Sequence, residues 1–63
     1  MPMIRVEMFK GRTQAQKSAM AKEITEAFLR TAGGTPESVH VVITEVDASD
    51  WAVGGQIIAE RNR

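Results

Sequence analysis

The segment from Val39 to Val46, which reads VHVVITEV, is the most strand-like stretch of the chain and decides its fold class. β-Branched residues dominate it, and they favour extended backbone because their side chains pack well on a pleated surface. Alternate positions fall on opposite faces of a strand, and here both faces carry valine or isoleucine. We therefore expect a strand that is at least partly buried on both sides.

A second strand is predicted nearer the N-terminus, from Met3 to Phe9, with the sequence MIRVEMF. Ile4, Val6 and Met8 share one face of this strand by period-two alternation. The following Lys10–Arg12 segment, with its central glycine, breaks the pattern and ends the strand.

An amphipathic helix is predicted between the two strands. Thr13 and Gln16 have the spacing of a capping box, which places the helix start at Thr13. The helix should run to about Ala32, because the Gly33–Gly34 pair is a typical stop signal. Its expected apolar face consists of Ala19 or Met20, Ile24, Ala27, Phe28 and Thr31.

Strand, helix and strand in this order form a β-α-β unit, so the two strands should be parallel. After a turn-rich loop, residues Trp51 to Ile58 predict a short hairpin or extended segment around Gly54–Gly55. The polar stretch from Ala59 to Arg63 should be frayed or lie against a neighbouring chain. The predicted fold is a single α+β domain over residues 1–63.

The length of 63 residues predicts an oligomer. A single core in a chain below about 70–80 residues rarely supplies more than about 3–5 kcal/mol of stability. Disulfides cannot add to it because the chain has no cysteine, and a metal site is not expected with one histidine and no clustered ligands. Association with other chains is the remaining common source of additional stability.

The charge pattern argues against several function classes. Eight basic and eight acidic residues give a formal net charge of +0, without the basic excess of a nucleic-acid binder. There is no Lys/Arg cluster for a membrane surface and no apolar run near the ~20 residues that span a bilayer. We expect a soluble cytoplasmic protein that binds neither nucleic acid nor membrane.

Pro2 is the first candidate for catalytic chemistry. Initiator methionine is normally removed before a small residue such as proline, which would leave a free secondary amine at the start of the first strand. Apolar surroundings or a nearby arginine would disfavour the cation and lower the pKa of this amine. A general base works best when its pKa lies near the operating pH. The alternative is that Pro2 merely begins a strand.

Three further residues are candidates for binding. Arg12 follows the first strand in a loop, where its guanidinium can hold a carboxylate through two parallel hydrogen bonds or simply face solvent. Trp51, the single tryptophan, is either a packing residue or the apolar wall of a pocket. His40 is either a satisfied, partly buried histidine of the second strand or a polar group of the site.

Together these features resemble the 4-oxalocrotonate tautomerase family. The resemblance rests on Pro2 after Met1, the run Gly11-Arg12-Thr13 followed by Gln16-Lys17, the segment Pro36-Glu37-Ser38-Val39, the strand Val42-Ile43-Thr44-Glu45, and the aromatic residue before Gly54-Gly55. It covers essentially the whole chain. No single motif is specific, and the combination carries the resemblance.

The resemblance implies a β-α-β fold, assembly into homo-hexamers, and a cofactor-independent and metal-independent isomerase of the kind used in aromatic compound degradation. It implies that Pro2 is the catalytic base for an enol–keto tautomerisation of a small 2-hydroxydienoate or enol-pyruvate type carboxylate. It also implies that Arg12 binds the substrate carboxylate and that Trp51 forms part of the hydrophobic pocket around the proline.

His40 departs from the family pattern, because a second functional arginine is expected at that position. An imidazole does not reproduce the permanently charged planar fork of an arginine. We therefore expect slow turnover of muconate-type diacids, with a monoacid enol such as phenylenolpyruvate as the better substrate and with His40 assisting at the carbonyl oxygen. Two alternatives stay open, a non-catalytic oligomeric binding subunit and a hydratase or dehalogenase of a small unsaturated acid. Val53 stands where the dehalogenases have a glutamate, which argues against dehalogenation.

Overall fold

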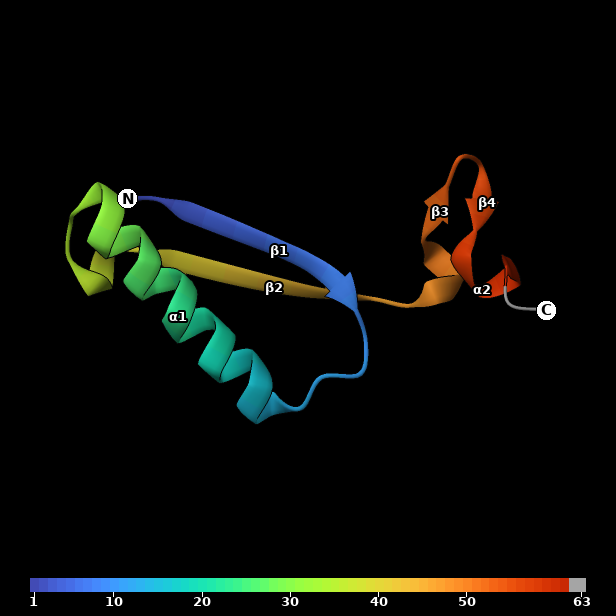
Figure 1. Ribbon diagram of the computed structural model, residues 1–63, viewed down its shortest axis with the longest axis horizontal. Coiled ribbons are helices and arrows are strands. Elements are labelled where there is room, and N and C mark those ends of the chain that lie inside the picture. The colour runs from blue at the N-terminus through green and yellow to red at the C-terminus, as the bar shows by residue number, and fades with distance from the viewer. Residues whose placement is uncertain (62–63) are drawn as a thin grey trace.

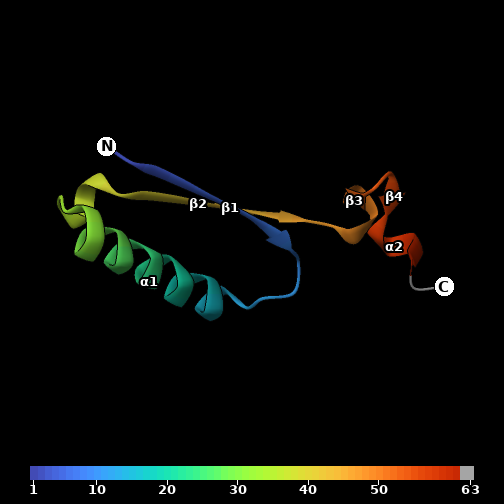
Figure 2. The same cartoon turned by 45° about the horizontal axis from the view of Figure 1, so that its top comes forward.

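The computed structural model describes residues 1–61 and has the predicted β-α-β architecture (Figure 1). Strands β1 (Met3–Phe9) and β2 (His40–Val46) pair in parallel, in a register that runs from Met3 opposite His40 to Phe9 opposite Val46. Helix α1 (Gln14–Ala32) connects them and lies along one face of the two-stranded sheet (Figure 2). The strand predicted from Val39 begins one residue later, because Val39 donates its N–H to the Pro36 carbonyl at the end of a 3-10 turn.

Helix α1 begins and ends at the predicted signals. The Thr13 hydroxyl accepts from the Gln16 N–H at 3.1 Å, and the Gln16 side chain accepts from the Thr13 N–H at 2.8 Å. This reciprocal capping box satisfies two of the N–H groups that every helix start leaves without an intrahelical partner. At the other end Gly33 has a φ of 81°, which favours glycine, and its N–H donates to the Leu29 carbonyl.

The face of the sheet that packs against α1 is only half-buried. On the sheet it carries Ile4, Val6, Met8, Val41 and Ile43, and on the helix Met20, Ile24, Ala27, Phe28 and Leu29. Of the apolar helix face predicted from sequence, Ala19 and Thr31 are instead exposed. Lys17 of the helix reaches Glu45 of β2 in a 3.1 Å salt bridge at the edge of this layer.

The opposite face of the sheet, called here the helix-free face, carries no helix (Figure 2). Alternation and register place eight side chains on it, namely Met3, Arg5, Glu7 and Phe9 from β1 and His40, Val42, Thr44 and Val46 from β2. Met3 is 54% exposed, Val42 40% and Phe9 37%. The apolar residues that the sequence places on the second side of the sheet are therefore present but largely uncovered in the isolated chain.

The C-terminal segment extends away from the sheet (Figure 1). A 3-10 turn at Ala48–Asp50 leads into a hairpin of β3 (Ala52–Val53) and β4 (Gln56–Ile57), as predicted, with Gly54 and Gly55 at its tip. Both glycines have positive φ, which suits a two-residue hairpin turn. Residues Ile58–Arg61 form the short helix α2, so the expectation of a frayed end is wrong for 59–61, whereas contact of this segment with a neighbouring chain stays a prediction. The last two positions of the predicted stretch lie outside the described residues.

Within the described residues, the isolated chain has no closed interior. Among residues 1–61 none is fully buried, whether apolar or polar. The Cα radius of gyration is 15.0 Å, whereas a compact chain of this length should have about 11 Å. The fold therefore leaves apolar surface that another chain must cover if the protein is to gain an ordinary core.

Candidate active site

Pro2 and His40 lie together at one end of the sheet. Pro2 immediately precedes β1, and its carbonyl accepts the His40 N–H at 3.0 Å, so that the parallel ladder holds both residues. Pro2 is half-buried, whereas His40 is exposed on the helix-free face. The interpretation of His40 as a partly buried, satisfied histidine is therefore wrong for the isolated chain. This end of the sheet is called here the proline end.

Arg12 and Trp51 lie at the opposite end, called here the tryptophan end. The indole of Trp51 packs against the Phe9 ring in a tilted arrangement, with centroids 4.6 Å apart and a 51° angle between the ring planes. Arg12 is exposed in the loop between β1 and α1. Lys10 donates its N–H to the Val46 carbonyl at 3.3 Å, which fixes the start of this loop to the end of β2.

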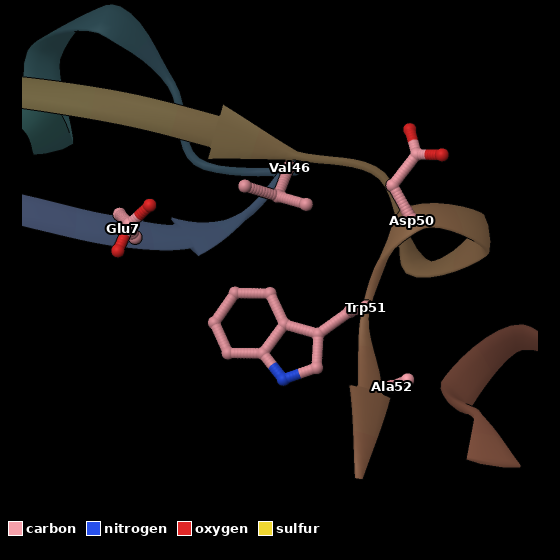
Figure 3. A pocket seen from close by; sticks show the side chains of 5 residues that line it. All are labelled: Glu7, Val46, Asp50, Trp51 and Ala52. Atoms are coloured by element: carbon pink, nitrogen blue, oxygen red, sulfur yellow. The ribbon is translucent and has the colours of Figure 1, made fainter. Parts of the chain in front are cut away.

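An open pocket of about 350 Å³ lies beside the indole (Figure 3). Its lining comprises Glu7, Val46, Asp50, Trp51 and Ala52. The Trp51 ring faces back toward the sheet, with Glu7 and Val46 across from it (Figure 3). Sequence reasoning missed Glu7 and Asp50. Strand alternation does place Glu7 on the face opposite Ile4, Val6 and Met8, but nothing local indicates that Trp51 folds back onto that face.

A carboxylate in the loop before Trp51 is held by local hydrogen bonds. The Ser49 hydroxyl donates to Asp47 Oδ2 at 2.8 Å. This hydrogen bond, with the positive charge of Lys10 and backbone donors, outweighs the opposing effect of desolvation and lowers the pKa of Asp47 below its ordinary value of 3.8. The ionised carboxylate therefore stabilises the turn that positions the indole.

A single chain does not bring the four predicted site residues together. Strand β1 has seven residues, so its two ends lie about 20 Å apart. Pro2 and His40 share one end, and Arg12 and Trp51 share the other. A site that uses both pairs must combine the proline end of one chain with the tryptophan end of another.

Two further features bear on ligand classes. Within residues 1–61 there is no group of three or more His, Asp or Glu side chains that could hold a metal ion. In the same part of the chain, no helix combines the length and the apolar character needed to cross a bilayer.

Comparison with known proteins identifies the family of this chain. The family model described as "Tautomerase enzyme" matches residues 2–61, which is nearly the whole chain. The chain belongs to the tautomerase family. A "probable tautomerase" of Streptococcus pneumoniae is 40% identical over 57 residues, which cover 90% of this chain and 95% of that protein. This membership supports an isomerase-type activity.

Solved structures give the same assignment at the level of the fold. The crystal structure of YwhB, a homologue of 4-oxalocrotonate tautomerase, superposes with a TM-score of 0.92 at 33% identity and covers 97% of this chain and 100% of its own. TomN, a 4-oxalocrotonate tautomerase homologue in the tomaymycin biosynthetic pathway, has a TM-score of 0.90 at 37% identity, with 95% and 92% covered. This tautomerase-family chain therefore shares its small β-α-β fold with 4-oxalocrotonate tautomerase homologues.

Proposed function

We propose that this tautomerase-family protein is a cofactor-independent enol–keto tautomerase of small 2-hydroxydienoate or enol-pyruvate type carboxylates, with Pro2 as the general base. The ring nitrogen of Pro2 takes the proton from the enol oxygen, and the oxygen–carbon bond becomes a carbonyl as the π electrons shift. The same nitrogen then returns the proton to a carbon of the conjugated system. Substrate and product are isomers, so no co-reactant is needed.

The position of Pro2 is the observation that carries this proposal. The residue is half-buried at the end of a strand, and its carbonyl is fixed by the His40 N–H, so its ring has a defined place in the fold. While Met1 is attached, the Pro2 nitrogen belongs to a tertiary amide and has no basicity. The proposal therefore requires that Met1 is removed, and an intact-mass measurement of the purified protein tests this directly.

Binding is assigned to the tryptophan end. Arg12 is exposed beside that end, where its guanidinium can hold a substrate carboxylate in a bidentate fashion. Trp51 supplies an apolar wall next to an open pocket. His40, at the proline end, donates a hydrogen bond to the carbonyl oxygen in this scheme.

The proposed site requires assembly, because its two pairs of residues lie at opposite ends of the sheet. In a two-fold symmetric pair each copy offers the same surface, so an antiparallel arrangement places the proline end of each chain against the tryptophan end of its partner. The uncovered apolar residues of the helix-free face and the elongated shape both support association. We propose a homo-oligomer, with the hexamer implied by the family resemblance as its expected size.

Mixing two inactive variants tests the shared site. Pro2→Ala removes the base and Arg12→Gln removes the carboxylate anchor, so each variant alone should be weakly active when the enol substrate is held far below the wild-type KM. If each site joins Pro2 of one copy to Arg12 of another, co-refolded equimolar variants regain about one quarter of wild-type activity, because half of the pairs are mixed and each mixed pair holds one intact site.

The outcomes of this experiment are distinct. Activity in Pro2→Ala equal to that of the wild type would overturn the tautomerase proposal. If the wild-type protein has the correct mass and an intact assembly but is inactive with every enol substrate tried, the non-catalytic binding subunit is favoured. Mass spectrometry of products from unsaturated acids separates tautomerisation from hydration, because hydration adds one water.

A further inference from the structure

The charged side chains of the helix-free face are segregated along the strands. Its two basic residues, Arg5 and His40, lie toward the proline end, and its one acidic residue, Glu7, lies toward the tryptophan end and lines the pocket there. The five other positions carry Met3, Phe9, Val42, Thr44 and Val46. Arg5 therefore brings the only permanent positive charge of this face to the half that holds Pro2.

Arg5 is within reach of the proline end. It pairs with Val42, which lies two residues beyond His40 on the same face of β2. Arg5 and His40 are therefore diagonal neighbours, and the backbone positions of such neighbours in a sheet are about 7–8 Å apart, a distance that long side chains can bridge. Because the His40 N–H donates to the Pro2 carbonyl, a guanidinium directed along the strand toward His40 lies at the same end of the sheet as Pro2.

Arg5 forms no ion pair within the described part of the chain. The salt bridge found in residues 1–61 joins Lys17 to Glu45 on the helix-covered side of the sheet. Arg5 itself is exposed among Met3 and Val42, two of the apolar residues that association would cover. A guanidinium enclosed in such surroundings requires an anionic partner, because burial of an unpaired charge is costly.

We propose that Arg5 is a further substrate-binding residue and holds the enol oxygen of the substrate while Pro2 removes its proton. This inference rests on the proposed function. Negative charge develops on that oxygen as the O–H bond breaks, and a preformed donor at this place stabilises it in the transition state. Arg12 then holds the carboxylate from the tryptophan end of a second chain, so each end contributes one guanidinium to the substrate.

The test compares steady-state kinetics of Arg5→Ala and Arg5→Lys with the wild type, on an enol substrate such as phenylenolpyruvate. Arg5→Ala should lower kcat about 10²-fold, as loss of an oxyanion donor does elsewhere, with a smaller change in KM. Arg5→Lys should recover part of the loss, because it keeps the charge but not the planar fork. Lys22→Ala, which removes an exposed cation from the helix, is the matched control, and its kcat and KM should equal those of the wild type.

A rescue experiment separates substrate binding from a structural role. His40→Arg places a guanidinium at the diagonal position of the same face, so it should restore part of kcat in the Arg5→Ala background. Native mass spectrometry should find all variants in the wild-type oligomer. Glu7→Gln should also retain that oligomer.

Two results would overturn the role of Arg5. One is a kcat for Arg5→Ala within threefold of the wild type. The other is dissociation of both Arg5→Ala and Glu7→Gln, which would identify an Arg5–Glu7 contact between copies. Either result, with Pro2→Ala inactive, leaves the tautomerase proposal standing, whereas an active Pro2→Ala overturns that proposal itself.

Discussion

The two ends of the β1–β2 sheet are built differently. At the proline end, backbone hydrogen bonds of a parallel ladder fix Pro2 and His40. At the tryptophan end, Arg12 and Trp51 belong to loops that leave the sheet, and the indole is placed by side-chain stacking on Phe9. The difference suits the proposed division of roles, in which the group proposed to move a proton lies on rigid backbone and the groups proposed to select a ligand lie on adaptable loops.

Removal of the base at the proline end should have the largest effect. Pro2→Ala should reduce kcat about 10²–10⁴-fold, the usual contribution of a positioned general base. KM should change little, because the carboxylate anchor belongs to the other end. Stopped-flow or continuous absorbance assays measure both constants, and a large rise in KM with unchanged kcat would contradict the division between the ends.

Removal of the anchor at the tryptophan end should act mainly on binding. Arg12→Gln loses a charge-assisted contact worth about 1.5–3 kcal/mol, which corresponds to a rise in KM of roughly 10–100-fold. Lys10→Gln removes a neighbouring loop charge and serves as the control. If Lys10→Gln raised KM as much as Arg12→Gln, general electrostatic attraction rather than a specific anchor would explain the effect.

The helix start at the tryptophan end should matter for stability and not for chemistry. Thr13→Ala removes one half of the capping box and should cost about 1 kcal/mol of unfolding free energy. Chemical denaturation at constant protein concentration measures this loss. Thr31→Ala, in the last turn of the same helix, is the comparison variant and should cost less, since its hydroxyl bonds only to helix carbonyls. Equal losses of unfolding free energy in the two variants would show that the capping box contributes no more than an ordinary hydroxyl contact within the helix.

The smallest expected effect concerns the loop that carries Trp51. Ser49→Ala removes the donor to Asp47, so the pKa of Asp47 should rise toward its ordinary value of 3.8. Because the pKa is lowered in the folded protein, the ionised carboxylate stabilises the fold above the unfolded-state pKa, and this contribution is lost as the pH falls through the folded value. NMR titration of the Asp47 carboxyl carbon measures the shift. An unchanged pKa would show that the backbone donors lower the pKa of Asp47 without the Ser49 hydroxyl.

Much of the β-α-β unit could be predicted because its signals are local. The alternation in Met3–Phe9, the capping box at Thr13 and the stop at Gly33 each act within a few residues, and each lies where the sequence places it. The hairpin around Gly54–Gly55 was likewise predicted from its turn residues. Short helix α2 was not, because four residues with mixed polarity give no periodic signal.

The site was harder to predict because its parts meet through space rather than along the chain. Pro2 and His40 are 38 positions apart, and only the parallel register brings them into contact. The fold-back of Trp51 onto Phe9, which makes Glu7 a pocket residue, depends on a loop conformation that no short pattern specifies. The roles of Pro2, Arg12, His40 and Trp51 stay predictions that the kinetic experiments above address.

Because no side chain among residues 1–61 is fully buried, the proposed homo-oligomer has a consequence for gene dosage. A newly made copy that gains its interior only by meeting other copies is exposed to proteolysis until it does. The steady-state amount of finished enzyme then depends on the synthesis rate more steeply than in direct proportion. A cell that halves transcription of such a gene would lose more than half of the working protein.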